Sequence, residues 1–189
     1  MRGEIYNNFL EVQLQAYLKE IFKDMTDEAI ENTPRRWLHA LWEMTEGYDQ
    51  DPKKILEKEF DAQTTGMVVD ADIPFYSLCE HHLMPFHGKV AIGYIADGKV
   101  VGLSKLPRLV ECFARRFQLQ ERLTDQIANA IDESLQPKGV MVVIDATHTC
   151  SSARGVGKEN TMITSAIRGE FNRPEVRAEF LSLIRRNGK

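Results

Sequence analysis

The sequence predicts an α+β fold in which helices cover one face of an antiparallel four-stranded sheet, and three observations support this prediction. Helical periodicity dominates residues 1–62. Runs rich in Val, Ile and Tyr follow between 66 and 103, and two further runs of this kind occupy 139–144 and 161–171. Helical patterns separate the two pairs of runs and follow Pro174. This order is typical of one layer of helices packed against one antiparallel sheet.

The first part of the chain, residues 1–62, is predicted to be an N-terminal helical region. Apolar residues recur at helical spacing from 5 to 22, which indicates an amphipathic helix. Thr33 and Pro34 provide an N-cap and a proline in the first position of a second helix. The core-facing stripe of that helix consists of Trp37, Leu38, Leu41 and Trp42.

The remaining residues, 63–189, are predicted to form a second domain. Before it, Asp51 and Pro52 repeat the start signal for a short helix that ends near Phe60. In the first strand-rich section, Asp97–Gly98 lies between two apolar runs and predicts a hairpin turn.

Two helices are predicted between the pairs of strands. Ser104 is a candidate N-cap for a helix that runs to Ala114, and a second helix follows Gln118 and ends before Pro137. Four strands in an open sheet leave two unpaired edges, which invite pairing with another copy of the chain. We therefore expect a homo-oligomer.

The overall charge does not indicate a nucleic-acid partner. Lys and Arg number 24 and Asp and Glu number 28, which gives a net charge of −4. A nucleic-acid backbone is usually bound by a clearly basic surface. The N-terminus lacks the apolar core of a signal peptide, and no stretch approaches the ~20 apolar residues of a membrane span. We expect a cytoplasmic location and neither a nucleic-acid nor a membrane partner.

Three Cys and His side chains have the spacing of a metal site. Cys79 and His82 lie three residues apart at the end of a predicted strand, and Cys150 ends another. Two thiolates and one imidazole leave the fourth position of a tetrahedral zinc ion to water, as in catalytic sites. Spacing alone leaves alternatives open, because the cysteines could be buried thiols or a disulfide and His82 a core histidine. Cys112, among apolar helix residues, is interpreted as a core thiol.

Two further histidines lie beside the candidate ligands. His148 precedes Cys150 by two residues, so both side chains would point to the same face of a strand. An imidazole in that position would be well placed for proton transfer. His81 is adjacent to His82 and is interpreted either as a second such group or as a packing residue.

Basic residues at one predicted helix start are candidates for binding an anion. Lys105 and Arg108 begin one helix, where free N–H groups and the helix dipole favour negative charge. Arg154 lies in a later loop, and a solvated surface is the alternative for all three residues. Gln120 and Glu121 begin the next helix, where a carboxylate suits the dipole whether or not it binds a ligand.

Four segments, taken together, resemble a known family. The successive signature segments of GTP cyclohydrolase I are similar to SLCEHHLMPFHGKVAIGYI, GLSKLPRL, QLQERLTDQIA and ATHTCSSARGV. They occur in the family's order, and the resemblance covers about Thr33 to Ile184. Chance would have to place ligands, proton donors and anchors in four separate stretches. The resemblance therefore makes a zinc site the preferred interpretation of Cys79, His82 and Cys150.

The resemblance implies a zinc enzyme that hydrolyses GTP. Cys79, His82 and Cys150 would bind one zinc ion per subunit, and water on that ion would attack carbon 8 of the guanine. His148 would protonate the imidazole ring of the base, and His81 would assist near the zinc water and the ribose oxygen. A second hydrolysis would release carbon 8 as formate. The product would be 7,8-dihydroneopterin triphosphate, the first intermediate of pterin and folate biosynthesis.

The resemblance also implies substrate contacts. Glu121 would accept hydrogen bonds from the ring N–H and the 2-amino group of guanine, and Gln120 would make a second contact with the base. Such a carboxylate selects guanine over adenine, which presents the opposite polarity at this edge. The remaining implied contacts are Lys105, Arg108 and Arg154 for the triphosphate and Ser104 for the sugar rearrangement.

The fold implied by the resemblance is the tunnelling fold, in which sheets from five subunits close into a ring and two rings stack into a decamer. Active sites of the family draw residues from more than one subunit. No feedback regulation is expected, because no long N-terminal extension precedes the resemblance. Two alternatives are a nitrile reductase of the same fold, which would use a cysteine nucleophile and NADPH, and a non-catalytic oligomer with structural zinc. The Cys79–His82 pair argues against the first, and a set of three ligands argues against the second.

Overall fold

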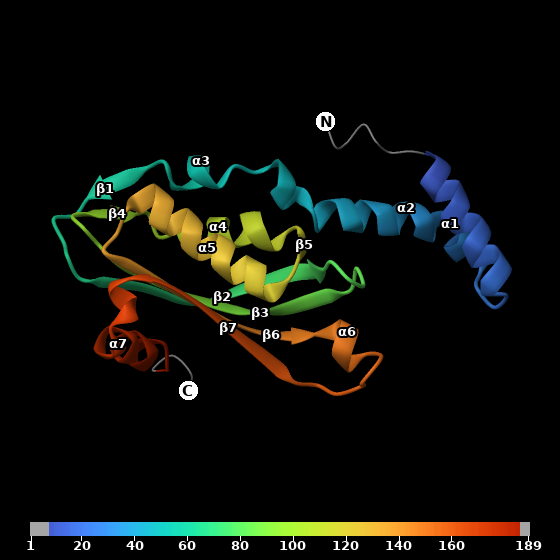
Figure 1. The fold of residues 1–189 in the computed structure, drawn as a ribbon. Helices are drawn as coiled ribbons and strands as arrows, with labels where there is room; N and C mark the ends of the chain where they lie inside the picture. Colours follow the sequence, from blue (N-terminus) through green and yellow to red (C-terminus); the bar gives the residue numbers. More distant parts are fainter. Residues whose placement is uncertain (1–7, 186–189) are drawn as a thin grey trace. The chain divides into compact units, whose positions relative to one another are not determined.

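The computed structural model describes residues 8–185 of the chain, which fall into two compact units divided between Met44 and Thr45. The first unit holds two helices, and the second holds the sheets and the remaining helices (Figure 1). The helix α1 (Asn8–Ile21) confirms the first predicted helix, whose residues 5–7 lie outside the described part. Within the described residues, no helix is both long and apolar enough to span a bilayer.

The start of α2 (Asp27–Glu43) differs from the prediction. The sequence favoured a start at Thr33 and Pro34, but Thr26 is the N-cap, and its hydroxyl accepts a hydrogen bond from the amide of Ala29 at 3.2 Å. Acidic residues in the first turn complement the helix dipole. This upstream cap determines the start, and Pro34 lies inside the helix, where its ring nitrogen lacks a hydrogen bond.

The predicted core-facing stripe of α2 is wrong for its two tryptophans. Trp37 is 47% exposed and Trp42 is 43% exposed in the single chain. Helical periodicity identifies an apolar face but does not say what covers it. Large apolar side chains that remain exposed in this way mark surfaces that another protein surface can cover.

The second unit is built on a five-stranded sheet with the order β5-β2-β3-β6-β7. Its strands are β2 (Met67–Cys79), β3 (Pro85–Ile95), β5 (Phe117–Gln118), β6 (Gly139–His148) and β7 (Thr161–Gly169). Neighbouring strands are antiparallel, except that the two-residue β5 runs parallel to β2. The α+β class is confirmed, and β5 adds a fifth strand to the four that were predicted.

The turn at Asp97–Gly98 does not form the predicted hairpin. β3 pairs with β2 on one side and with β6 on the other, so neither of its edges is open to the strand that follows it. That strand, β4 (Lys99–Val101), pairs instead with β1 (Glu59–Asp61) in a separate two-stranded sheet. The hairpin that does form joins β2 to β3 through residues 80–84.

Helices pack on both faces of the sheet, not on one face as predicted (Figure 1). α4 (Lys105–Ala114) and α5 (Gln120–Leu135) lie on one face, and α7 (Pro174–Arg185) lies on the other. The main core on the first face includes Ile92, Leu109, Ile127, Ile131 and Val142. The smaller core under α7 is formed by Ile95, Met141, Phe171 and Phe180. The final helix was predicted, but periodicity could not say which face it covers.

Short helices connect these elements. α3 (Pro52–Leu56) confirms the predicted start, because the Asp51 carboxylate accepts a hydrogen bond from the amide of Lys53 at 2.9 Å. Single turns of 3-10 helix occur at Glu46–Asp49 and Glu170–Asn172. The second of these leads from β7 into α7.

Gly93→Ala should destabilise the protein, because β3 approaches α7 too closely for a side chain there. A Cβ atom at Gly93 would lie 2.6 Å from the Phe180 ring and 3.3 Å from Phe171. We expect a loss of about 1–3 kcal/mol, as for other overpacked cores, and a lower midpoint in differential scanning calorimetry. Gly66→Ala is the matched control, because its Cβ would have its nearest neighbour at 3.6 Å. An unchanged midpoint for Gly93→Ala would contradict this packing.

Candidate functional site

The turn between β2 and β3 brings two of the predicted ligands together. Cys79 is the last residue of β2, and its carbonyl accepts hydrogen bonds from the amides of His82 at 3.3 Å and Leu83 at 2.8 Å. Leu83 has a left-handed φ of 54°. The amide of Cys79 donates to the carbonyl of Met84 at 2.9 Å. The chain therefore folds back on itself, and Cys79 Sγ lies 3.9 Å from His82 Nδ1.

Cys150 reaches the same place from α6 (Thr149–Ser152), a short helix directly after β6. This differs from the prediction that Cys150 ends a strand, because β6 ends at His148. The argument that His148 and Cys150 point to one face of a strand is therefore wrong. The hydroxyl of Thr149 donates to the carbonyl of Pro85 at 2.5 Å and ties α6 to the start of β3.

The three residues form a group whose chemistry fits a zinc ion. One ligand atom each from Cys79, His82 and Cys150 lies within 4.8 Å of the other two. Tetrahedral zinc, with bonds of about 2.0–2.3 Å, holds such atoms roughly 3.5–3.8 Å apart. Burial raises the pKa of the Cys150 thiol, and the facing Cys79 sulfur raises it further. A divalent cation between the two sulfurs favours both thiolates, and this donor set suits zinc.

His148 is held in one orientation by Gln120. Gln120 is only 1% exposed, and its side-chain nitrogen donates to the carbonyls of Ile144 at 3.1 Å and Met162 at 2.9 Å. Carbonyl groups only accept hydrogen bonds, so the amide oxygen is the atom that faces His148 Nε2 at 2.8 Å. His148 Nε2 therefore carries a hydrogen, and Nδ1 is the ring nitrogen left for proton exchange.

Gln120 also joins α5 to β7. Its side-chain nitrogen lies 3.2 Å from the hydroxyl of Thr164, and the hydroxyls of Thr124 and Thr164 are 2.7 Å apart. The observed contacts of this side chain lie inside the protein. A contact between Gln120 and a substrate base stays a prediction.

Two neighbours set the environment of the His148 ring. The ring stacks on Phe86, with centroids 4.5 Å apart and planes within 4°. Burial lowers the pKa of His148, and the negative charge of Glu121 offsets part of that effect. Glu121 itself is exposed in the first turn of α5. Sequence reasoning missed Phe86, because an apolar strand residue carries no signal beyond a core position.

His81 and Arg154 are exposed near the ligand residues of the same chain. The ring of His81 lies 6.2 Å from the ring of His82, centroid to centroid, with 83° between their planes. Arg154 follows α6, and its positive charge lowers the pKa of Cys150, although burial outweighs that effect. His81 and Arg154 therefore lie near the candidate metal group, and their roles in proton transfer and triphosphate binding stay predictions.

Ser104, Lys105 and Arg108 are not brought to this group within one chain. They lie at the start of α4, directly after β4. α4 runs toward β5, where Gln118 pairs with Cys79, so the end of α4 approaches the ligands and its start does not. A helix of ten residues spans about 15 Å. Ser104 and Lys105 therefore lie about a helix length from the end of α4 that approaches the ligands, and Arg108 lies one turn into the helix.

The sequence comparisons with known proteins agree with one another. A family model described as GTP cyclohydrolase I matches residues 10–185. GTP cyclohydrolase 1 of Wolinella succinogenes is 49% identical over 181 residues, which cover 92% of this chain and 97% of that protein. GTP cyclohydrolase 1 of Campylobacter lari is 51% identical over 177 residues, which cover 92% and 93%. A solved structure, the archaeosine synthase QueF-Like in the apo form, superimposes with a TM-score of 0.41 at 16% identity over 53% of this chain and 93% of that chain.

The purified protein should bind one zinc ion per chain, and Cys150→Ser should lose it, because a serine hydroxyl is a poor zinc ligand. The measurement is metal content by mass spectrometry after gel filtration. Cys112→Ser is the matched control, because the Cys112 thiol is buried on α4 and burial raises its pKa. Zinc retained by Cys150→Ser, or lost from Cys112→Ser, would contradict the assignment.

Proposed function

The chain belongs to the GTP cyclohydrolase I family, and we propose that Cys79, His82, Cys150 and His148 form its active site. The enzyme hydrolyses GTP, releases carbon 8 of the guanine as formate and forms 7,8-dihydroneopterin triphosphate, the first step toward pterins and folates. Membership of this family decides against a nitrile reductase and against a non-catalytic oligomer.

The contact between His148 and Gln120, next to the clustered ligand residues, is the observation that supports the site assignment most directly. A site that opens a purine ring needs an activated water and a positioned proton donor. Zinc bound by Cys79, His82 and Cys150 would supply a Lewis acid that makes water nucleophilic near neutral pH. The protein's own groups supply the proton transfer and the recognition of the base.

His148 is proposed to exchange a proton with the imidazole ring of the guanine through Nδ1. The hydrogen bond from Nε2 to Gln120 supports this choice of atom. Stacking on Phe86 keeps the ring plane fixed, and burial favours the neutral imidazole between proton transfers. His81 is exposed on the turn between β2 and β3 that carries Cys79 and His82, which is called the ligand turn below. It would assist in proton transfer near the ribose oxygen.

Glu121 is proposed to select guanine. Its carboxylate lies in the first turn of α5, where the N-terminal end of the helix favours negative charge. The carboxylate can accept hydrogen bonds from two adjacent N–H groups of guanine, whereas adenine presents an acceptor in their place. The effect of Glu121 on the pKa of His148 supports a common site for both residues. Gln120 is proposed to make a second contact with the base.

The triphosphate site is proposed to combine two copies of the chain. Arg154 would come from one copy, because it follows α6 beside the metal group. Lys105 and Arg108, with Ser104 for the sugar rearrangement, would come from the start of α4 in a neighbouring copy. Their distance from the ligands of their own chain supports this arrangement.

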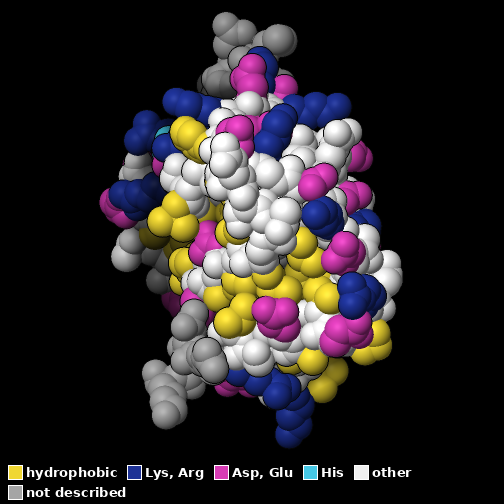
Figure 2. Space-filling model, turned by 90° about the vertical axis from the view of Figure 1, so that its left-hand side faces the viewer, with side chains coloured by type: hydrophobic (Ala, Val, Ile, Leu, Met, Phe, Trp, Pro, Cys, Tyr) yellow, Lys and Arg dark blue, Asp and Glu magenta, His cyan; other side chains and the backbone are white. Residues whose placement is uncertain are grey.

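The sheet offers a way to join these copies. Within the described residues, β7 pairs only with β6, and β2 is paired on its outer side only at Leu78 and Cys79. Pairing of β2 with β7 of the next copy would close a ring, and we propose a decamer of two stacked five-membered rings. Hydrophobic side chains gather on the face shown in Figure 2, which supports burial against another copy. A cytoplasmic location is proposed because a reducing compartment keeps Cys79 and Cys150 as thiols.

Zinc-loaded, assembled protein incubated with GTP should release formate and yield a fluorescent pterin after oxidation. His148→Ala should keep its zinc but lose about 10²–10⁴-fold in turnover, as expected for a lost proton donor. His87→Ala is the matched control, because this ring packs on Tyr76, with centroids 5.3 Å apart, on the opposite face of β3 from Phe86. Full turnover in His148→Ala, or neither product from the unaltered protein, would refute the proposal.

A further inference from the structure

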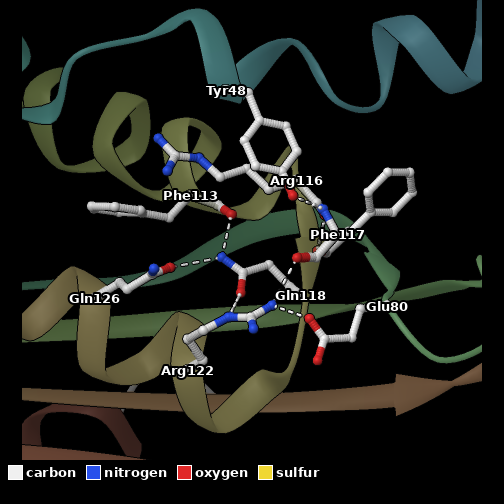
Figure 3. Close-up of polar contacts among 9 residues, drawn as sticks. Tyr48, Glu80, Phe113, Arg116, Phe117, Gln118, Arg122 and Gln126 are labelled. Atoms are coloured by element: carbon white, nitrogen blue, oxygen red, sulfur yellow. Dashed lines mark hydrogen bonds and ion pairs between the residues drawn. The ribbon is translucent and has the colours of Figure 1, made fainter.

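A half-buried ion pair links the turn that carries the metal ligands to the helix that carries Glu121 (Figure 3). Glu80 lies directly between Cys79 and His81, and its Oε2 atom is 2.5 Å from Nη2 of Arg122 on α5. Arg122 immediately follows Glu121. The two charged residues are 42 positions apart, so neither motif alone indicates the contact.

Arg122 has two further partners, which fix the plane of its guanidinium group. Nη2 donates to the carbonyl of Phe117 at 2.8 Å, and Nε donates to the side-chain oxygen of Gln118 at 3.0 Å (Figure 3). The planar fork of arginine can meet these acceptors together, whereas a lysine ammonium cannot reproduce the arrangement. Arg122 is therefore held between the turn and the helix start.

Gln118 supports the network from the core side. It is only 1% exposed, and its side-chain nitrogen donates to the carbonyl of Phe113 and to the side-chain oxygen of Gln126, both at 2.8 Å. These acceptors require the amide oxygen of Gln118 to face Arg122. The network thus connects the end of α4, the first turns of α5 and the ligand turn (Figure 3).

The hydrogen bonds of Arg122 and Gln118 lie next to Cys79, where β2 ends and the turn with the metal ligands begins. β5 pairs with β2 through Leu78 and Cys79, and the amide of Glu80 donates to the carbonyl of Gln118 at 3.1 Å. The side chain of Glu80 adds a further contact at the residue that directly follows Cys79. A change in this contact would shift the turn against α5.

We infer that Arg122 is a positioning residue of the active site, which holds the ligand turn 79–82 in register with the first turn of α5. Through this contact the metal ligands keep a fixed distance from Glu121 and from His148, which Gln120 orients from the same helix turn. The inference rests on the proposed function, because Glu121 and His148 take their roles from it. Arg122 acts through these groups, since its described hydrogen bonds end on protein acceptors.

A positioning role predicts effects that an ordinary surface ion pair would not cause. Exposed ion pairs contribute little to stability and are screened by salt. Removing a contact that orients metal ligands lowers metal affinity or activity by about 10–100-fold. Zinc retention and turnover should therefore respond to a change at Arg122 more than folding does.

The test compares Arg122→Gln with Arg168→Gln. Arg168 binds the same helix through Asp125 at 3.0 Å and Asn129 at 2.7 Å, away from the ligand turn. Zinc release to a chelator is followed for each protein, together with kcat and KM for GTP. In Arg122→Gln we expect about tenfold faster zinc release and a kcat lower by about 10–100-fold. Its KM should stay within about threefold of the unaltered value, and Arg168→Gln should match the unaltered protein.

Two further variants separate positioning from folding. Arg122→Lys keeps the charge but not the planar fork, so it should recover zinc retention only in part. Glu80→Gln breaks the same bridge from the ligand turn, and the double variant Glu80→Gln/Arg122→Gln should be no worse than Arg122→Gln. If Arg122→Gln does not assemble, zinc release, kcat and KM of Glu80→Gln are compared with those of Arg168→Gln instead.

Unaltered zinc release together with unaltered kcat in Arg122→Gln would overturn the inference, as would additive losses in the double variant. A raised KM with unchanged kcat would also overturn it, because Arg122 would then be a substrate contact. Absence of formate from the unaltered protein would count against the proposed function alone. The zinc-release measurement would still test the positioning role in that case.

Discussion

The buried side-chain amide of Gln120 is the contact on which the rest of the site depends. It lies where α5, β6 and β7 meet, and a polar group in such a place is stable only when its atoms have partners. Its side-chain nitrogen donates hydrogen bonds to the carbonyls of Ile144 and Met162. Its side-chain oxygen is therefore the atom that accepts a hydrogen bond from His148. The same amide therefore joins helix to sheet and sets the tautomer of the imidazole. A single buried side chain thus serves both the packing of the core and the orientation of His148.

Local patterns predict those parts of the fold that depend on near neighbours. The cap at Asp51 and the order of strands and helices follow from residues close in sequence. The errors occur where a competing or distant residue decides the outcome. Pro34 resembles a helix start, but Thr26 caps the helix seven residues before Thr33. Asp97–Gly98 resembles a hairpin turn, but both sides of β3 are already paired with strands that lie far along the chain.

In the candidate site, too, contacts between near neighbours could be predicted from the sequence, and contacts between distant segments could not. Spacing could name Cys79 and His82 as a pair, and their turn does bring them together. It could not show that Cys150 lies in a helix, that Phe86 supports His148, or that Arg122 meets Glu80, because each of these contacts joins distant segments. The roles of Glu121 and the triphosphate contacts came from resemblance to a family. The choice of Nδ1 as the reacting nitrogen came from hydrogen-bond polarity, which only a structure provides.

The left-handed backbone of Leu83 has a consequence for the life of the protein in the cell. A side chain larger than hydrogen makes this conformation unfavourable by about 1–3 kcal/mol, and the surrounding contacts must maintain it. Zinc held by Cys79 and His82 would bind the folded turn more tightly than the unfolded chain, and it would therefore stabilise the folded state. The abundance of the folded protein would then follow the metal supply of the cell as well as the quality of its hydrophobic core. Zinc starvation would thus reduce the amount of enzyme, not only its activity.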